Sequence, residues 1–384
     1  MDFSFTEDQA AIRDSARRFA RERLAPGYAQ RESEGRIGRE LIREMAALGF
    51  IGADLPAAAG GLGQTSVTAG ILIEEIAFAD INVAYVQLLA SLTGAMVAAH
   101  GREPLTQEII AGICTGEMIV ALALTEPRGG SDAAHLEFRA ERRGDDYRLN
   151  GEKTSISMAE QADYALLFAR TDPSKAGAGG VSAFLVPLDS PGISRSSIDD
   201  VGSAAVGRGS LFFDDVTVAA GNLIGREGAG FRQVMRGFDY SRALIGLQCL
   251  APAKASLTET WQYITERKAF GNALASYQGV TEPLAEAETL LEAARLLCYK
   301  TLWLRDANDQ HTAEAAMCKW WAPKTAFETI HRCLLTHGHS GYARDLPHQQ
   351  RLRDVMGLQI GDGTEQIQKM VIAREKVGRI AVPY

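Results

Sequence analysis

The chain has 384 residues, 46% of them hydrophobic and 23% charged, so it can bury a large core shared by two or three subdomains. Its formal net charge of −8 disfavours a general nucleic-acid binder, because phosphate affinity requires a dense positive face. The five cysteines form no Cys-x-x-Cys pair, and no apolar run reaches the length of a membrane span. We therefore expect a cytoplasmic, globular protein without a disulfide framework, a metal site or a membrane anchor.

The first third of the chain has helical patterning. Thr6 followed by Gln9 is typical of a capping box, and apolar residues at helical spacing continue until Pro26. The apolar stretch 71–99 is interrupted by Gly and Asp and lacks the alternation of a strand. Residues 1–117 are therefore predicted to form an N-terminal helical domain.

The pattern changes after Gly116. Short runs at 120–124, 164–168 and 181–186 are rich in residues that favour strands. Asn150-Gly151 is the strongest local hairpin signal, and it predicts a chain reversal at that point. Residues 118–225 are predicted to form a middle β-domain.

Helical spacing returns from Phe231 onward. It is clearest over residues 284–302, where Thr281 is the expected N-cap and Pro283 lies in the first turn. Residues 226–384 are predicted to form a C-terminal helical domain built on a four-helix bundle. The predicted fold class is therefore α+β, mainly α, with the order helices, sheet, helices.

Five motifs, spread over nearly the whole chain, together resemble the acyl-CoA dehydrogenase family. They are residues 124–132 (LTEPRGGSD), 150–153 (NGEK), 225–231 (GREGAGF), 266–271 (ERKAFG) and 361–368 (GDGTEQIQ). Each motif alone is weak evidence, but five in the family's order and spacing are specific. The resemblance implies that the chain binds FAD and an acyl-CoA, assembles as a homotetramer and passes electrons to an electron-transfer flavoprotein.

The resemblance implies an FAD site built partly from the first two motifs. In the family, the turn that matches residues 124–131 lies along the isoalloxazine ring, and hydroxyls such as those of Thr125 and Ser131 bond its polar edge. The family commonly places Trp at the position of Ser155, so this serine is expected to open one side of the flavin. The implied contacts in this region are Leu122, Leu124, Thr125, Gly130, Ser131, Ser155 and Ser157.

A second group of implied cofactor contacts lies in the last third of the chain. Residues such as Arg267 match positions that reach across a subunit interface toward a neighbour's FAD, where a guanidinium fork suits a diphosphate. Gly338 matches a turn near the adenylate, and Thr364 lies where the last long helix opens and presents its amides to oxygens of a ligand. The group comprises Arg267, Phe270, Gln278, Gly338, Thr364 and Gln366.

The family's catalytic base is a glutamate, and the residue at the matching position is Asp362. Removing the alpha proton of a thioester requires a carboxylate, and aspartate is one methylene shorter than glutamate. Gly361 stands where many relatives carry a large residue, so the pocket gains volume beside the base. Together these departures predict a bulky acyl group, as in a cyclohexanecarboxyl-CoA dehydrogenase or a branched-chain enzyme.

Some relatives carry the base on an earlier helix, immediately before an arginine, where this chain has Ser241 before Arg242. Serine cannot serve as that base, so Asp362 remains the candidate. Asp239 and Arg242 match residues that hold the CoA portion, although an ion pair between core helices is an alternative interpretation. The implied substrate contacts are Ser131, Asp239, Arg242, Gly361 and Gly363.

Two other hypotheses remain open at this stage. The first is a flavin oxidase of the same fold, because nitroalkane oxidases resemble this family and also use aspartate at the equivalent position. The second is a catalytically silent member that only binds acyl-CoA. Asp239 and Arg242 disfavour the oxidase, and the intact motif set disfavours a silent protein. The seven histidines show no metal-ligand spacing.

Overall fold

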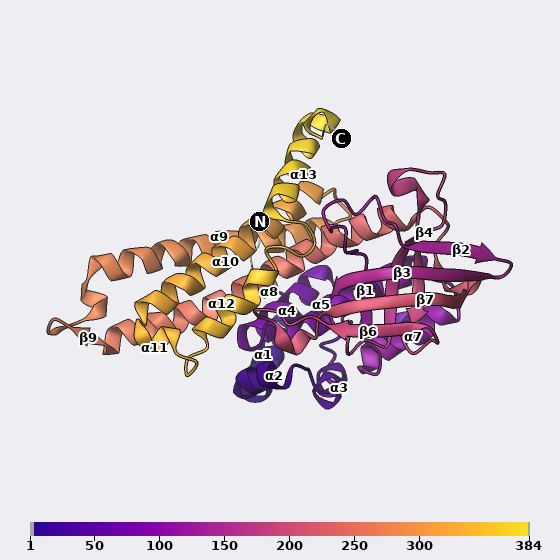
Figure 1. The fold of residues 1–384 in the computed structure, drawn as a ribbon. Coiled ribbons are helices and arrows are strands. Elements are labelled where there is room, and N and C mark those ends of the chain that lie inside the picture. Colours follow the sequence, from indigo (N-terminus) through magenta and orange to yellow (C-terminus); the bar gives the residue numbers. More distant parts are fainter. Residues whose placement is uncertain (1–3, 383–384) are drawn as a thin grey trace.

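The computed structural model describes residues 4–382, which form helices, then a sheet, then long helices in chain order (Figure 1). The first region contains α1 (Glu7–Phe19), α2 (Tyr28–Glu34), α3 (Arg39–Ala47), α4 (Ser66–Ala79), α5 (Ala84–Leu89), α6 (Ala95–His100) and α7 (Leu105–Thr115). Helix α1 begins as predicted, because the Thr6 hydroxyl accepts the Gln9 amide while the Gln9 side chain accepts the Thr6 amide, each at 3.2 Å. Helix α4 is buried on almost every side, which explains its continuous apolar sequence.

The middle region forms one mixed sheet. Its strands are β1 (Val120–Ala123), β2 (Arg139–Arg143), β3 (Asp146–Ile156), β4 (Tyr164–Arg170), β5 (Val181–Pro187), β6 (Ile193–Ser197), β7 (Gly209–Ala219) and β8 (Leu223–Ile224). They lie in the order β6-β7-β3-β2-β4-β5-β8, and β1 pairs in parallel with β4. The runs predicted at 120–124, 164–168 and 181–186 are strands β1, β4 and β5.

The predicted hairpin at Asn150-Gly151 is wrong. These two residues lie inside β3, and the chain reverses earlier, at Gly144-Asp145 between β2 and β3. Gly151 has a φ of 142° at a β-bulge against β7, and a Cβ there would lie 2.7 Å from the ring of Phe138. Gly151 is therefore needed for a β-bulge and for a close contact with Phe138. Its preference for a positive φ is met there without a turn.

The last region contains α8 (Gly230–Glu266), α9 (Gln278–Asp306), α10 (Thr312–Thr336), α11 (His339–Tyr342), α12 (His348–Gly357) and α13 (Glu365–Val377). Helices α8, α9 and α10 pack side by side, and the short hairpin of β9 (Lys268–Ala269) and β10 (Asn272–Ala273) lies at the end far from the sheet (Figure 1). The predicted N-cap at Thr281 is wrong, because α9 begins at Gln278. The Thr281 hydroxyl donates to the Tyr277 carbonyl inside the first turn.

Asp354 of α12 joins the three regions in the interior. Its carboxylate accepts hydrogen bonds from the Tyr28 hydroxyl at 2.6 Å, from the Asn82 side-chain amide at 2.9 Å and from the Ser203 backbone amide at 2.6 Å. The three donors come from α2, the loop before α5 and the sheet region. Because α12 leads directly into the turn that carries Asp362, these hydrogen bonds also fix the point where that turn begins.

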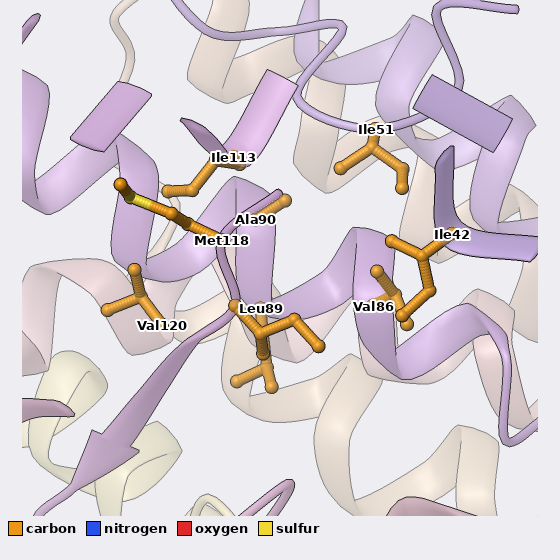
Figure 2. A pocket seen from close by; sticks show the side chains of 9 residues that line it. Ile42, Ile51, Val86, Leu89, Ala90, Ile113, Met118 and Val120 are labelled. Atoms are coloured by element: carbon orange, nitrogen blue, oxygen red, sulfur yellow. The ribbon is translucent and has the colours of Figure 1, made fainter. Parts of the chain in front are cut away.

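Figure 2 shows a small apolar cavity in the N-terminal part of the core, next to β1. It is lined by Ile42, Ile51, Val86, Leu89, Ala90, Ile113, Met118, Ile119 and Val120. A lining without polar side chains cannot orient a substrate, so this cavity is a packing gap rather than a site. Over residues 4–382, no helix is both long and apolar enough to cross a membrane.

Candidate active site

The turn between α12 and α13 carries Asp362. Asp362 and Gly363 have φ values of 55° and 101°, the left-handed conformation that an Asp-Gly pair favours. Lys319 of α10 donates to the Leu358 carbonyl at 2.7 Å and to the Gly363 carbonyl at 3.3 Å. Gln368 of α13 donates to the Asp362 carbonyl at 2.9 Å. Side chains from two helices therefore hold the backbone of this turn in place.

The carboxylate of Asp362 faces α8. The Ser241 hydroxyl donates to Asp362 Oδ2 at 2.8 Å, and Arg242 Nε donates to the Asp362 carbonyl at 3.3 Å. Burial raises the pKa of Asp362, while the Ser241 hydrogen bond and the positive charges of Lys319 and Arg242 lower it. Burial also lowers the pKa of Lys319 to about 8, against the opposing effect of Asp362. A carboxylate whose pKa is set by such opposing effects of burial and positive charge is suited to proton abstraction.

Asp239 and Arg242 form an ion pair within α8, not between helices. Arg242 Nη1 lies 3.2 Å from Asp239 Oδ1, and the Thr312 hydroxyl donates to Asp239 Oδ2 at 2.7 Å. Arg242 is only 5% exposed, and its other bond goes to the turn of Asp362. The arginine thus supports the candidate base directly, and its contact with CoA stays a prediction.

A buried ion pair fixes the turn that follows β1. Lys153 of β3 is fully buried, and its ammonium donates to Glu126 at 2.7 Å and to the Leu124 carbonyl at 2.9 Å. Glu126 is 4% exposed and also accepts the backbone amides of Glu137 and Phe138 at 2.7 and 3.1 Å. The start of this segment is therefore anchored in the core, whereas residues 127–132 are exposed.

This anchored turn brings several predicted flavin contacts together. The Thr125 carbonyl accepts the Thr154 amide at 2.9 Å, which places the turn against the end of β3, where Ser155 and Ser157 lie. Within the described residues, the hydroxyls of Thr125, Ser131 and Ser157 make no hydrogen bond. Three hydroxyls without a protein partner, close to the end of β3, fit the polar edge of a flavin.

The other residues predicted around this turn differ in exposure. Leu122 of β1 is partly exposed, whereas Leu124 is buried. A Cβ at Gly130 would be 3.5 Å from the Thr125 methyl group, so these two residues are neighbours. Ser155 is exposed and has a φ of 58° at an irregularity in the pairing of β3 with β7. The flavin contacts predicted for this part of the chain therefore share one region, and their roles stay predictions.

The second predicted group divides between two places. Thr364 and Gln366 begin α13, beside Asp362, and the Thr364 side chain makes no capping bond. Arg267, Phe270 and Gln278 lie instead at the far end of α8 and α9 (Figure 1). Gly338 is close to them, because His337 stacks on Tyr263 of α8 with ring centroids 4.1 Å apart.

The distant group lies far from the Asp362 turn, which Arg242 contacts. From Arg242 to Arg267, α8 extends about 38 Å at 1.5 Å per residue. The β-hairpin that includes Phe270 lies at the opposite end of the molecule from the sheet, and Phe270 itself is 96% exposed (Figure 1). Their contact with the cofactor of a neighbouring subunit stays a prediction.

The sequence interpretation gave no role to Lys153 or Lys319, and it missed the hydrogen bond that Ser241 donates. Lys319 had a visible signal, because it lies within the apolar run 315–322 of α10 and a lysine at a core position usually has a partner. Lys153 had a weaker signal in the strand alternation of β3. Ser241 was considered only as a group unable to act as base.

The comparisons with known proteins agree with this geometry. Residues 6–117, 121–216 and 228–377 match the models of the acyl-CoA dehydrogenase N-terminal, middle and C-terminal domains. The chain therefore belongs to the acyl-CoA dehydrogenase family. It is an FAD-dependent oxidoreductase, and solved structures that share its fold include FAD complexes.

Particular relatives resemble the chain over nearly its whole length. The probable acyl-CoA dehydrogenase YngJ of Bacillus subtilis is 32% identical and covers 98% of this chain and 99% of its own. The caffeyl-CoA reductase-Etf complex subunit CarC of Acetobacterium woodii is 34% identical, with coverage of 96% and 98%. The structure of butyryl-CoA dehydrogenase from Megasphaera elsdenii matches with a TM-score of 0.94 and 31% identity, covering 98% of this chain and 100% of that one.

Proposed function

We propose that the chain desaturates an acyl-CoA thioester at its alpha and beta carbons, with Asp362 taking the alpha proton. The observation that carries this proposal is the placement of the Asp362 carboxylate. It lies in a turn held by Lys319 and Gln368, and it is the acidic group at the position where the family carries its base. The Thr125 turn would hold FAD, and the bound flavin would supply the acceptor for the beta hydrogen as hydride. The thioester carbonyl is polarised by backbone amides at the Asp362 turn.

The substrate we propose is bulky next to the thioester, such as cyclohexane-1-carboxyl-CoA or a branched acyl-CoA. Gly361 supports this choice. Its φ lies outside the left-handed region, and a Cβ there would have only the Gly357 carbonyl oxygen within reach, at 4.0 Å. Neither conformation nor contact therefore requires glycine at 361. The missing side chain leaves space beside a shortened carboxylate, where a ring or branch at the alpha carbon fits.

The proposed electron acceptor is an electron-transfer flavoprotein, and the proposed assembly is a homotetramer. Large apolar side chains are exposed at several separate points of the C-terminal helical region, where contact with other copies would cover them. They are Phe270, Leu335, Tyr342, Ile360, Val377 and Ile380, exposed by 62% or more. A second copy packed against the end of α8 and α9 would cover Phe270 and bring Arg267 to its neighbour's cofactor. Light scattering on the purified protein tests the assembly, and a monomer with a full complement of FAD would refute it.

The reaction is tested by anaerobic flavin bleaching. We expect cyclohexanecarboxyl-CoA or a methyl-branched acyl-CoA to bleach the wild-type flavin faster than a straight-chain thioester of similar size. If only straight chains bleach it, the inference from Asp362 and Gly361 is wrong. Rapid peroxide formation in air would instead favour an oxidase, and a colourless purified protein would favour a binding module.

The role of the base is tested with Asp362→Asn, which preserves the size of the side chain. We expect this variant to keep FAD and to lose bleaching by about a hundredfold to ten-thousandfold, the range that general base catalysis contributes. Asp309→Asn, a change at an exposed carboxylate between α9 and α10, is the matched control and should behave like the wild type. Turnover retained by Asp362→Asn would show that another group removes the proton.

A further inference from the structure

Ser241 lies on α8 and is fully buried. Serine and threonine hydroxyls inside helices usually bond the carbonyl one turn earlier. Thr258 and Thr260 on the same helix do so, each with the carbonyl four residues before it, at 2.8 and 2.7 Å. The Ser241 hydroxyl instead crosses to the turn between α12 and α13 and donates to Asp362 Oδ2 at 2.8 Å. Its single donor is thus committed to the candidate base.

The two oxygens of the Asp362 carboxylate are not equivalent. Oδ2 accepts the Ser241 bond, whereas Oδ1 accepts no hydrogen bond from the part of the chain that the structure describes. The backbone of the turn is already fixed by Lys319, Arg242 and Gln368. The remaining freedom of Asp362 lies in its two side-chain torsions, and the Ser241 bond restrains both. A short side chain tolerates little misplacement, because small displacements at a reacting group cost large factors in rate.

We propose that Ser241 is a positioning residue, whose hydroxyl holds Asp362 Oδ2 so that Oδ1 is presented to the alpha proton of the substrate. The proposal rests on the proposed function above, in which Asp362 is the base. It gives a role to the position where some relatives carry the base itself. The serine supplies a hydrogen bond that compensates for the reduced reach of the aspartate.

The charged and titratable groups around Asp362 come from several helices. Arg242 of α8 and Lys319 of α10 favour its ionised form. Burial raises the pKa of Tyr85 of α5, and the charge of Asp362 makes a smaller contribution in the same direction. All of these groups stay in place when Ser241 is changed. Removing the Ser241 hydroxyl therefore removes one donor that stabilises the carboxylate, and the pKa of Asp362 should rise.

The test compares Ser241→Ala and Ser241→Thr with the wild-type holoenzyme. We expect Ser241→Ala to bleach the flavin about tenfold more slowly, because a hydrogen bond to a charged group is lost. The acid limb of its pH–rate profile should move to higher pH, whereas product binding, read from the flavin spectrum, should stay within about twofold. Ser241→Thr keeps the hydroxyl and should restore both the rate and the profile.

Ser256→Ala is the matched control. Ser256 is buried on the same helix, about 22 Å further along, and accepts a hydrogen bond from Arg351. A wild-type rate and profile for Ser241→Ala would overturn the proposal. So would a slower rate with an unmoved profile that threonine does not restore, since that result indicates packing alone. Bleaching retained by Asp362→Asn would refute the proposed base instead, so the two failures are distinguishable.

Discussion

Replacing Lys153 by methionine removes the positive charge from the buried ion pair that anchors the Thr125 turn. The ammonium is 2.7 Å from Glu126 and 2.9 Å from the carbonyl of Leu124, the residue before Thr125. Lys153 is 0% exposed and Glu126 is 4% exposed, so water cannot replace the lost partner without disrupting the core. Lys153→Met therefore leaves a buried carboxylate without its counter-charge.

The expected cost follows from this burial. Removing one partner of a buried ion pair typically costs about 3–5 kcal/mol of unfolding free energy. Two backbone amides continue to bond Glu126, which favours the lower part of this range. The double variant Lys153→Met, Glu126→Gln has no uncompensated charge and should recover at least about half of the loss. Lys175→Met is the control, because Lys175 is 64% exposed beside Asp172 and its pair should contribute at most about 1 kcal/mol.

The assay is denaturant unfolding followed by circular dichroism, together with the ratio of flavin to protein absorbance. Lys153→Met should lose both stability and bound FAD, because the Thr125 turn is no longer anchored. Lys175→Met should keep both properties. The reasoning is refuted if the two single variants are equally stable, or if the double variant is less stable than Lys153→Met.

Two further predictions concern the junction and the turn that position the base. Burial raises the pKa of the Asp354 carboxyl from 3.8 to about 6. The folded protein therefore binds this proton more tightly than the unfolded chain does. The free energy of unfolding should fall by about 3 kcal/mol as the pH rises from about 4 through 6. Asp354→Asn should flatten this part of the stability–pH curve, measured by thermal unfolding at pH 5 and 7.5; parallel curves would contradict it. Gly363→Ala should cost about 1–3 kcal/mol, because φ is 101° and a Cβ would collide with Gln368, whereas Gly361→Ala should change stability by less than about 0.5 kcal/mol. Equal melting temperatures for the two alanine variants would refute this prediction.

Sequence reasoning succeeded where a signal is local. The Thr6 capping box and the strands at β1, β4 and β5 depend on neighbouring residues or on short periodicity, and the structure has them as predicted. It failed where one local preference allows two outcomes. Asn150-Gly151 favours positive φ, which suits a hairpin turn and a bulge equally, and packing against Phe138 decided for the bulge. Thr281 can cap a helix or lie within it, and the chain entering from Tyr277 decided for the second.

The motifs by themselves determined the family, the position of the candidate base and the order of helices, sheet and helices, because these properties are encoded in residue identity and spacing. The tertiary structure alone decided which side chains meet. Ser241 and Asp362 are 121 positions apart, and Lys153 and Glu126 are 27 apart. No pattern along the chain records such a contact, since it forms only when packing brings separate elements together and removes the water between them.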